Sequence, residues 1–363
     1  MTECSGEEEV GEMVQLLTPD GERVHHPDYD VEPTPEELRE MYRLMVLTRR
    51  VDTEGVTLQR QGELGLWPSS LGQEAAQVGS GLAMGEDDHV FPSYRDHGVA
   101  VVRNVDPLHI FRLFRGVSHG GWDPAEKNFH LYTLVIGSQV LHATGYAMGV
   151  ADDGAETAVI AYFGDGATSQ GDVSEAFNFA AVYDAPVVFF CQNNQWAISQ
   201  SVERQSKVPI HRRAAGFGFP GVRVDGNDVL ACLAVTRAAR ERARGEREAT
   251  LVEAFTYRMG AHTTSDDPTR YVRSAEVTQW AKKDPIVRLE RYLLKNEWVD
   301  TDFLGLVEKE GDQLARHIRE SVRAMPDPGL TDFFDTTYAG THPLVTEEQE
   351  WFEDYEASFT GGA

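Results

Sequence analysis

Residues 162–196 read YFGDGATSQGDVSEAFNFAAVYDAPVVFFCQNNQW, and this stretch decides the fold. It starts at the end of one apolar run, passes through a segment of helical character and reaches a second apolar run, "PVVFFC". Runs that are apolar on both faces and alternate with helices are typical of parallel strands covered on both sides. The stretch therefore predicts a β-α-β unit.

The same alternation extends from residue 133 to residue 260, where "TAVIAYF", "GVRV" and "TLVEAFTYRM" have the character of further strands. This pattern predicts an α/β fold, with a doubly wound, mostly parallel sheet flanked by helices. We expect a single α/β domain over 35–325, beginning with a long helix that ends near Gly62 and closing with helices over 284–299 and 301–324. An acidic, poorly ordered tail is expected over 1–34, and a C-terminal extension over 326–363.

Composition excludes one class of partner. The chain has 363 residues, with 33 basic against 59 acidic side chains and a net charge of −26. Nucleic acid is an unsuitable partner because phosphate binding needs net positive charge. Only six of the basic residues are Lys. A dense acidic surface with few lysines fits a halophilic protein, since high salt screens self-repulsion, and an ordinary acidic enzyme is the alternative.

The three cysteines, Cys4, Cys191 and Cys232, show neither paired spacing nor a Cys/His cluster. Neither a disulfide framework nor a structural zinc site is therefore expected. No uncharged apolar run approaches the roughly 18 residues that span a bilayer, and the acidic start is unlike a signal peptide. We expect a cytoplasmic protein with no membrane partner.

The ends of the two strands in the opening stretch carry oxygen ligands. Asp165 follows the first strand and Asn194 follows the second, and parallel strands end at the same edge of a sheet, where open α/β sheets bind ligands. Carboxylate and amide oxygens suit Mg²⁺ or Ca²⁺, and the remaining ligands would come from water and phosphate. Gly164 and Gly166 permit close backbone approach, and a helix starting near Ser169 would direct its N–H groups to the same place. These features predict a metal-bridged diphosphate; the alternative is that each tripeptide only makes a turn.

The paired Gly-Asp-Gly and Asn-Asn resemble the thiamine-diphosphate-binding motif. More closely, the chain resembles the alpha subunit of the decarboxylating component of 2-oxo acid dehydrogenase complexes. The likeness runs from about residue 35 to 325. It includes, in the family's order, "LGQEAAQVGSGLAM", "FPSYRDHG", "IGSQV", "GDGATSQGD", "NNQWAIS", "VRVDGNDVLA", "YRMGAHTTSDDPTRY" and "WAKKDPIVRLERYL".

The resemblance implies a set of roles. Asp165, the side chain of Asn194 and the carbonyl of Trp196 would bind Mg²⁺, where the family usually has Tyr or Phe at the third position. Arginines would bind the diphosphate, and Ile136 would hold the cofactor in its bent shape. Other members often have Gly or Ser at Leu134. The implied cofactor-binding residues are Tyr94, Arg95, Leu134, Ile136, Gly164, Asp165, Gly166, Ala167, Asn194, Arg258 and His262.

The implied reaction is the decarboxylation of a 2-oxo acid on thiamine diphosphate, followed by transfer of the acyl group to a lipoyl acyltransferase core. His262 resembles the family's active-site His, a role that suits an imidazole titrating near neutral pH, and His119 resembles a second one. The segment 261–271 resembles a mobile loop over the site. Mammalian members are phosphorylated on a Ser directly after the His; here that position is Thr263, with Thr264 and Ser265 as other acceptors.

One chemical part is expected on another chain. Thiamine enzymes need a carboxylate against the aminopyrimidine, and in the family a separate beta subunit supplies it. The resemblance implies two alpha and two beta chains, with this chain inactive alone. Asp172 and Glu175, spaced i and i+3, are candidates for a proton path between paired sites, or else acids that favour a helix N-terminus.

Several functions stay open on the sequence. The substrate is a branched-chain 2-oxo acid or pyruvate, or acetoin in a related dehydrogenase. A second possibility is a catalytically lapsed subunit that only holds the cofactor or assists assembly. A third is another metal–diphosphate binder, such as a nucleotide-dependent regulator, although no phosphate loop with Lys is present.

Overall fold

The computed structural model describes residues 13–118 and 121–360. The chain up to Arg323 forms one compact unit, and the chain from Ala324 forms a second. The first unit contains a six-stranded sheet in the order β1-β7-β8-β4-β3-β2, in which every neighbouring pair is parallel. The predicted parallel α/β sheet is thus confirmed. Its strands are β1 (Met13–Val14), β2 (His89–Phe91), β3 (Val159–Gly164), β4 (Val187–Asn193), β7 (Gly221–Asp225) and β8 (Thr250–Phe255).

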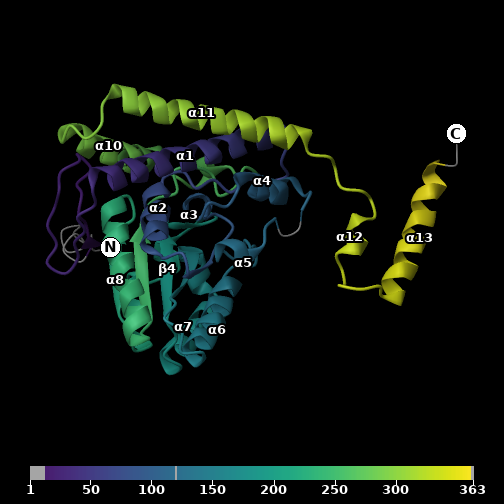
Figure 1. Ribbon diagram of the computed structural model, residues 1–363, viewed down its shortest axis with the longest axis horizontal. Helices are drawn as coiled ribbons and strands as arrows, with labels where there is room; N and C mark the ends of the chain where they lie inside the picture. The colour runs from purple at the N-terminus through teal and green to yellow at the C-terminus, as the bar shows by residue number, and fades with distance from the viewer. Residues whose placement is uncertain (1–12, 119–120, 361–363) are drawn as a thin grey trace. The chain divides into compact units, whose positions relative to one another are not determined.

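Helices cover the two faces of this sheet (Figure 1). The helices α6 (Ser138–Asp152) and α7 (Gly171–Val182) pack together on one face, and α2 (Glu74–Ala83) and α8 (Val229–Glu246) pack together on the other. Both faces of β3 and β4 are therefore buried, as their mostly apolar sequences require.

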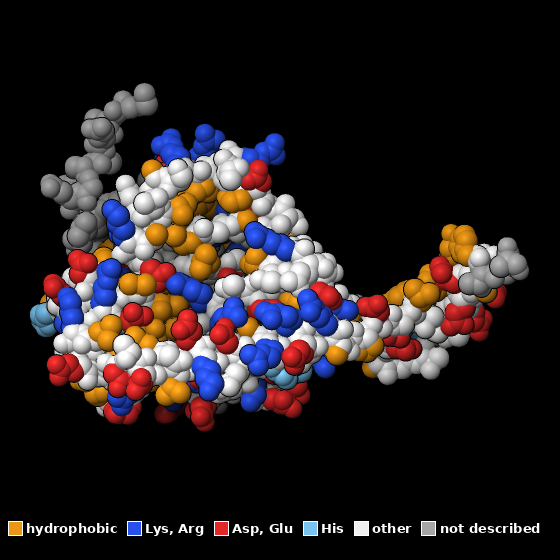
Figure 2. All heavy atoms as spheres, turned by 90° about the horizontal axis from the view of Figure 1, so that it is seen from above, with side chains coloured by type: hydrophobic (Ala, Val, Ile, Leu, Met, Phe, Trp, Pro, Cys, Tyr) orange, Lys and Arg blue, Asp and Glu red, His pale blue; other side chains and the backbone are white. Residues whose placement is uncertain are grey.

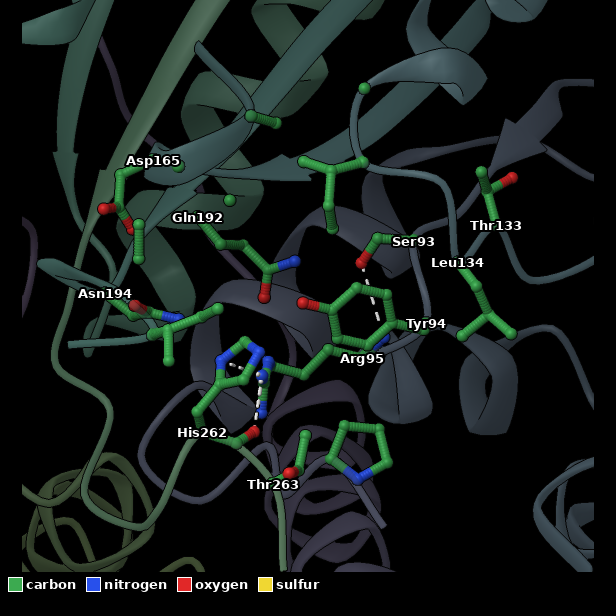
Figure 3. A pocket seen from close by; sticks show the side chains of 18 of the residues that line it. Ser93, Tyr94, Arg95, Thr133, Leu134, Asp165, Gln192, Asn194, His262 and Thr263 are labelled. Carbon is green, nitrogen blue, oxygen red and sulfur yellow. Dashed lines mark hydrogen bonds between the residues drawn. The ribbon is translucent and has the colours of Figure 1, made fainter. Parts of the chain in front are cut away.

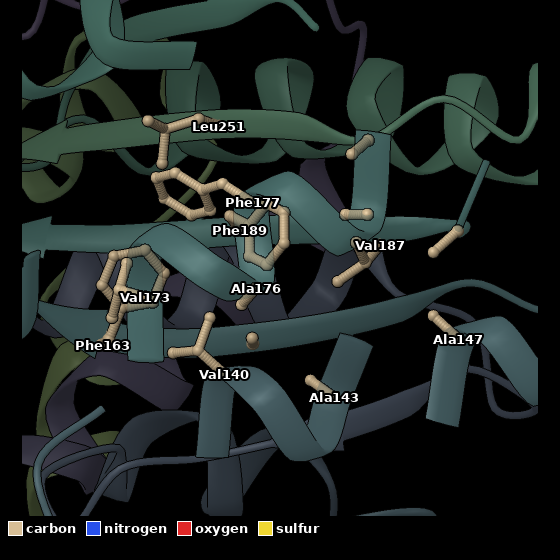
Figure 4. Close-up of a cluster of buried hydrophobic side chains, with 14 of the residues drawn as sticks. Val140, Ala143, Ala147, Phe163, Val173, Ala176, Phe177, Val187, Phe189 and Leu251 are labelled. Atoms are coloured by element: carbon tan, nitrogen blue, oxygen red, sulfur yellow. The ribbon is translucent and has the colours of Figure 1, made fainter. Parts of the chain in front are cut away.

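The main core lies between the sheet and the α6–α7 face (Figure 4). Alternate side chains of β3 and β4 point into it, and Phe177 of α7 packs on Phe189 of β4 with ring centroids 4.7 Å apart. Tyr162 points to the opposite face, where its hydroxyl donates to Ser80 Oγ of α2 over 2.9 Å. Burying a Phe side chain in this core contributes about 1.5–3 kcal/mol to the free energy of unfolding.

A layer of long helices lies along one end of the sheet. The helix α1 (Pro35–Arg60) starts with a capping box at Thr34 and Glu37. The helices α10 (Pro285–Lys295) and α11 (Thr301–Ala324) run alongside it (Figure 1). The three helices were predicted from the sequence. Arg319 of α11 donates to both carboxylate oxygens of the buried Glu54, over 2.8 and 2.7 Å. Basic and acidic side chains are interspersed on this face (Figure 2).

The remaining α-helices and strands of the first unit are short. They are α3 (His97–Val102), α4 (Pro107–Arg115), α5 (Pro124–Lys127), α9 (Ser274–Ala281), and the antiparallel pair β5 (Trp196–Ala197) and β6 (Gln200–Ser201). The second unit contains α12 (Asp332–Asp335) and α13 (Pro343–Thr360), and Phe333 and Phe334 pack on Phe352 within it. No Lys or Arg occurs after residue 323.

One local expectation needs correction, and one is confirmed with a small refinement. Residues 13–34 were expected in a poorly ordered tail, but β1 pairs with β7, and Leu16 and Leu17 are fully buried. Their amides both donate to Asp228 Oδ2, over 2.7 and 2.6 Å, so apolar burial and a buried acceptor order this segment. The helix expected from near Ser169 is present: a 3₁₀ turn spans Asp165–Ser169, and α7 begins at Gly171.

Among the described residues, no helix is long and apolar enough to cross a bilayer. Cys191 and Cys232 are both buried and unpaired, and Cys4 lies outside the described residues.

Candidate cofactor site

The carboxyl ends of β3 and β4 form one side of a cavity of about 440 Å³. Gly164 pairs with Gln192 in the parallel register, so the two strands end together, with Asp165 and Asn194 just beyond them. Both residues line the cavity (Figure 3). The β-α-β geometry thus brings together two side chains that are far apart in the sequence.

Most of the residues implied as cofactor ligands meet in this cavity. Arg258 is not among the lining residues, and His119 lies outside the described part of the chain. The implied residues that line the cavity are Tyr94, Arg95, Leu134, Ile136, Gly164, Asp165, Gly166, Ala167, Asn194, Trp196 and His262.

Asp165 is a buried carboxylate with little compensation for its charge. Its side chain is 1% exposed, and Oδ2 accepts a hydrogen bond from Gln205 Nε2 over 3.1 Å. Burial raises the pKa of Asp165 to about 6, although the Gln205 hydrogen bond, the Arg258 charge and the Asn194 backbone each lower it. A buried carboxylate facing a cavity and partnered by a neutral amide suits a bound cation.

The Asn-Asn turn presents two more oxygens. Asn194 is buried, its Oδ1 accepts from the backbone N–H of Trp196 over 3.2 Å, and its Nδ2 donates to Gln73 Oε1 over 3.3 Å. Gln195, between Asn194 and Trp196, has φ +70°, a left-handed conformation that turns the chain back over the strand end. With Asp165, the amide oxygen and the Trp196 carbonyl make a set of hard oxygen donors that fits Mg²⁺ or Ca²⁺ and leaves about half the shell to other ligands.

Gly166 is required by close packing rather than by backbone conformation. A Cβ at this position would lie 2.7 Å from Cβ of Ala197 in β5. At Gly164 the nearest atom to an added Cβ would be the Gln192 carbonyl oxygen, at 4.0 Å. The second glycine of the motif therefore lets the β5–β6 hairpin close over the 3₁₀ turn.

His262 lies between two guanidinium groups. Its Nδ1 is 3.2 Å from Arg95 Nη2 and 3.4 Å from Arg258 Nη1. Because both neighbours only donate, Nδ1 accepts, and the proton of the neutral ring is on Nε2. Burial and then the charges of Arg95 and Arg258 lower the pKa of His262 to about 3. The expected titration near neutral pH is therefore not found in this arrangement, and His262 is a neutral donor.

Arg258 lies outside the cavity wall and is hydrogen-bonded to segments that form it. It is 1% exposed, and its Nη1 donates to the Trp196 carbonyl over 3.1 Å. Its Nη2 donates to the Ile198 carbonyl over 2.7 Å and to the Tyr271 hydroxyl over 2.8 Å. The guanidinium that the resemblance implies for the diphosphate is thus engaged with the hairpin and the loop over 261–271. Arg95 lines the cavity and donates through Nη2 to the His262 carbonyl over 2.8 Å.

Four glutamines in the cavity wall were not singled out from the sequence. They are Gln73, Gln139, Gln170 and Gln192. Gln73 Nε2 and Gln139 Oε1 are buried with no hydrogen-bond partner among the described residues. Buried amides without partners are costly, so these two atoms suit a polar ligand. The positions of Gln73 and Gln139 inside the quoted "LGQEAAQ" and "IGSQV" are the only signal that the sequence offers.

Apolar side chains form a large part of the cavity wall. In the view of Figure 3, Asp165 and Asn194 lie on one side and Thr133 and Leu134 on the other. Leu134 and Ile136 are 56% and 41% exposed, although both are large apolar side chains. The apolar residues of the wall are Leu66, Pro68, Phe114, Leu134, Ile136, Ala197 and Ile198, together with Ala167 and Trp196.

The other residues singled out from the sequence lie outside the centre of the cavity. Asp172 and Glu175 are exposed on α7 and do not line it. Thr263 lines the cavity, Thr264 Oγ1 accepts from the backbone N–H of Trp67 over 3.1 Å, and Ser265 is exposed.

Comparison with known proteins decides the family. Residues 42–330 match the family model described as "Dehydrogenase E1 component". The chain belongs to the dehydrogenase E1 component family. The match contains every described residue of the cavity wall.

Curated dehydrogenase E1 components align along almost the whole chain. The 3-methyl-2-oxobutanoate dehydrogenase subunit alpha of Mycobacterium tuberculosis is 46% identical over 345 residues, 93% of each chain. The pyruvate dehydrogenase E1 component subunit alpha of Staphylococcus epidermidis is 36% identical over 349 residues, 95% of this chain and 94% of its own. The corresponding subunit of Staphylococcus aureus is 35% identical over the same length.

Proposed function

We propose that this dehydrogenase E1 component is the alpha subunit of a 2-oxo acid dehydrogenase that binds thiamine diphosphate through Mg²⁺. The observation that carries the proposal is the joint placement of Asp165 and Asn194 at the cavity wall, on the ends of adjacent parallel strands. Asp165, the Asn194 amide oxygen and the Trp196 carbonyl would hold the ion, and diphosphate oxygens and water would complete its shell.

The residues of this chain would bind and orient. Bound thiamine diphosphate supplies the electron sink for decarboxylation of the 2-oxo acid. Ile136, apolar yet 41% exposed, would support the cofactor, and Arg95 would face its negative end. His262 would donate a hydrogen bond from Nε2 to an oxygen that gains negative charge, because its Nδ1 already accepts from Arg95 and Arg258.

The preferred substrate is a branched-chain 2-oxo acid. The relative at 46% identity is named for 3-methyl-2-oxobutanoate, and those at 36% and 35% are named for pyruvate. The apolar wall formed by Leu66, Pro68, Phe114 and Leu134 favours an aliphatic side chain over a methyl group, by about 0.8 kcal/mol per buried CH₂. Pyruvate is the second candidate.

A beta subunit would complete the site. Among the described residues of the cavity wall, the only carboxylate is Asp165, which the metal would use. The carboxylate that activates the cofactor would therefore come from another chain. The exposed apolar side chains Tyr146 of α6 and Phe179 and Val182 of α7 suit its docking. We propose an assembly of two alpha and two beta chains that passes its acyl group to a lipoyl acyltransferase.

The test is reconstitution with a candidate beta chain. The two chains are co-expressed, and reduction of an artificial electron acceptor is measured with 3-methyl-2-oxobutanoate, pyruvate and acetoin, with and without thiamine diphosphate and Mg²⁺, at low and high salt. We expect turnover only with both chains and the loaded cofactor, and the highest kcat/KM for 3-methyl-2-oxobutanoate. Cofactor binding without turnover on any 2-oxo acid would instead support a lapsed subunit.

A further inference from the structure

A charged residue lies in the middle of a central strand of the sheet, where its neighbours along the strand are apolar. Glu253 of β8 is fully buried, as are Leu251, Val252 and Ala254 beside it. A carboxylate in such a place is costly unless every oxygen is satisfied. The residue lies outside the cavity wall, so direct contact with a ligand does not explain it.

The partners of Glu253 divide between its two oxygens. Oε1 accepts from Asn193 Nδ2 over 2.7 Å and lies 3.8 Å from Arg223 Nε of β7. Oε2 accepts from the backbone N–H of His211 over 3.0 Å and lies 2.9 Å from His211 Nδ1. Burial raises the pKa of the Glu253 carboxyl, but the His211 hydrogen bonds and the Arg223 charge outweigh burial and bring it below the usual range. Glu253 is therefore a carboxylate acceptor.

The Asn193 side chain links Glu253 to the turn that is proposed to bind the metal. While its Nδ2 is held by Glu253, its Oδ1 accepts from the backbone N–H of Gln195 over 3.1 Å. Gln195 has the left-handed φ of +70° that redirects the chain between Asn194 and Trp196. Fixing the Asn193 amide in one orientation thus fixes the backbone on which both expected metal oxygens are carried.

We infer that Glu253 is a positioning residue for the metal site: through Asn193 it holds the turn that presents the Asn194 side chain and the Trp196 carbonyl to the cation. The inference rests on the function proposed above. It assigns a task to the first Asn of the Asn-Asn pair, whose side chain points back into the sheet toward Glu253. Partners that orient metal ligands commonly change metal affinity ten- to hundredfold when they are removed.

The first test replaces Glu253 with Gln in the co-expressed alpha–beta complex. A Gln side chain keeps the shape but offers an N–H group to Asn193 Nδ2 or to His211, so two donors face each other. Binding of Mn²⁺, used as a paramagnetic substitute for Mg²⁺, is followed by electron paramagnetic resonance in the presence of thiamine diphosphate. We expect the Kd for Mn²⁺ to rise at least tenfold, and Asn193→Asp, which opposes two carboxylates, to have a similar effect.

A double variant that exchanges the acid and the amide between positions 253 and 193 distinguishes a positioning role from a general effect on the buried core. In Glu253→Gln/Asn193→Asp the oxygen of the new amide accepts from His211, and its N–H group donates to one oxygen of the new carboxylate. The other oxygen of that carboxylate accepts from the backbone N–H of Gln195. The net charge and the hydrogen bonds among Asn193, Glu253, His211 and Gln195 are kept, while the negative charge moves from position 253 to position 193, away from Arg223. We expect the Kd for Mn²⁺ to return to within about threefold of wild type.

Glu54→Gln is the matched control. Glu54 is also a buried glutamate, paired with Arg319 on the helical layer and away from the sheet edge. It should lower thermal stability with little change in the Kd for Mn²⁺. Should Glu253→Gln not be recovered folded, Asn193→Ser breaks the same connection from its other end, and the same tenfold loss is expected.

Three results would overturn the inference. They are wild-type affinity in Glu253→Gln, wild-type affinity in Asn193→Ser, and a double variant that binds no better than folded Glu253→Gln. If wild type itself binds no Mn²⁺ with thiamine diphosphate, the proposed cofactor fails, and the inference fails with it.

Discussion

Arg258 donates from Nη1 to the backbone carbonyl of Trp196 over 3.1 Å, so a buried cation already holds the carbonyl that is expected to bind the metal. A carbonyl oxygen has two lone pairs, and the same atom can accept this bond and bind an ion. The contact also joins the β5–β6 hairpin to the loop over 261–271, because Arg258 Nη2 reaches the Tyr271 hydroxyl over 2.8 Å.

We expect Arg258→Lys to loosen both segments. A lysine cannot reproduce the planar fork that reaches Trp196, Ile198 and Tyr271 together. Hydrogen exchange measured by mass spectrometry should become at least tenfold faster over residues 196–201 and 261–271. Arg103→Lys is the control, since Arg103 also donates to two backbone carbonyls, those of Gly85 and Asp88, away from the cavity. Equal exchange in the two variants would contradict a special role for Arg258.

Asn194→Ala should abolish binding of thiamine diphosphate with Mg²⁺. The change removes one of the expected oxygen ligands and leaves Gln73 Oε1 without its donor. Titration calorimetry on the alpha–beta complex should show at least a hundredfold loss of affinity. Asn194→Asp keeps an oxygen at the same position and should retain measurable binding. Tight binding by Asn194→Ala would contradict the metal assignment.

Gly166→Ala should destabilise the protein by about 1–3 kcal/mol, because its Cβ would lie 2.7 Å from the Cβ of Ala197. Urea unfolding measures the change. Adding Ala197→Gly removes the clashing atom and should recover most of the loss, since the next atoms are at 3.5 and 3.8 Å. Gly164→Ala, whose nearest contact is at 4.0 Å, should stay within about 0.5 kcal/mol of wild type. A loss in Gly166→Ala that Ala197→Gly does not relieve would refute this account.

The strand ends could be predicted from the sequence because strong, local signals determine them. The mostly apolar runs of β3 and β4 require burial on both faces, and two strands joined by one helix lie side by side at the same edge. Asp165 and Asn194 follow directly from this arrangement. The buried position of Leu16 and Leu17 was missed, because β1 has only two residues and its order depends on a distant acceptor, Asp228.

The conformations of long side chains could not be predicted from sequence patterns. Arg258 was expected to face a diphosphate, but the positions of the Trp196 and Ile198 carbonyls decide where its guanidinium lies. The low pKa of His262 likewise results from burial and then from the charges of Arg95 and Arg258, which are widely separated in the chain. Such features depend on tertiary packing, which no local pattern encodes.

His97 should make stability sensitive to acid. It is fully buried, its Nε2 lies 3.0 Å from the Pro68 carbonyl and its Nδ1 lies 3.0 Å from the Tyr132 hydroxyl. Burial lowers the pKa of His97 to about 3. An unfolded His has a pKa of about 6.5, so between these values the unfolded state binds a proton that the folded state does not. The contribution of neutral His97 is therefore complete above about pH 6.5 and falls as the pH drops toward 3.

We expect the stability difference between wild type and His97→Gln to narrow on acidification. The wild type should lose up to about 1.4 kcal/mol per pH unit below pH 6.5 from this group alone, and the Gln variant should not. Urea unfolding of both proteins at pH 5, 6, 7 and 8 measures this difference in the free energy of unfolding. The contributions of all other titrating groups are the same in both proteins and cancel. The difference should be constant from pH 7 to 8. A difference that is also constant from pH 7 to 5 would show that His97 takes up its proton in the folded state.

The pairing of Gly164 with Gln192 has a consequence for how this protein tolerates insertions and deletions. The two positions proposed to bind the metal, Asp165 and Asn194, are fixed by strand register, and α7 between them only has to return the chain to the start of β4. Adding or removing residues in the exposed turn after α7, around Asp184, would change the spacing of the sequence motif without moving either Asp165 or Asn194. A one-residue insertion within β4 would turn its apolar side chains to the wrong face and displace Asn194 at the same time.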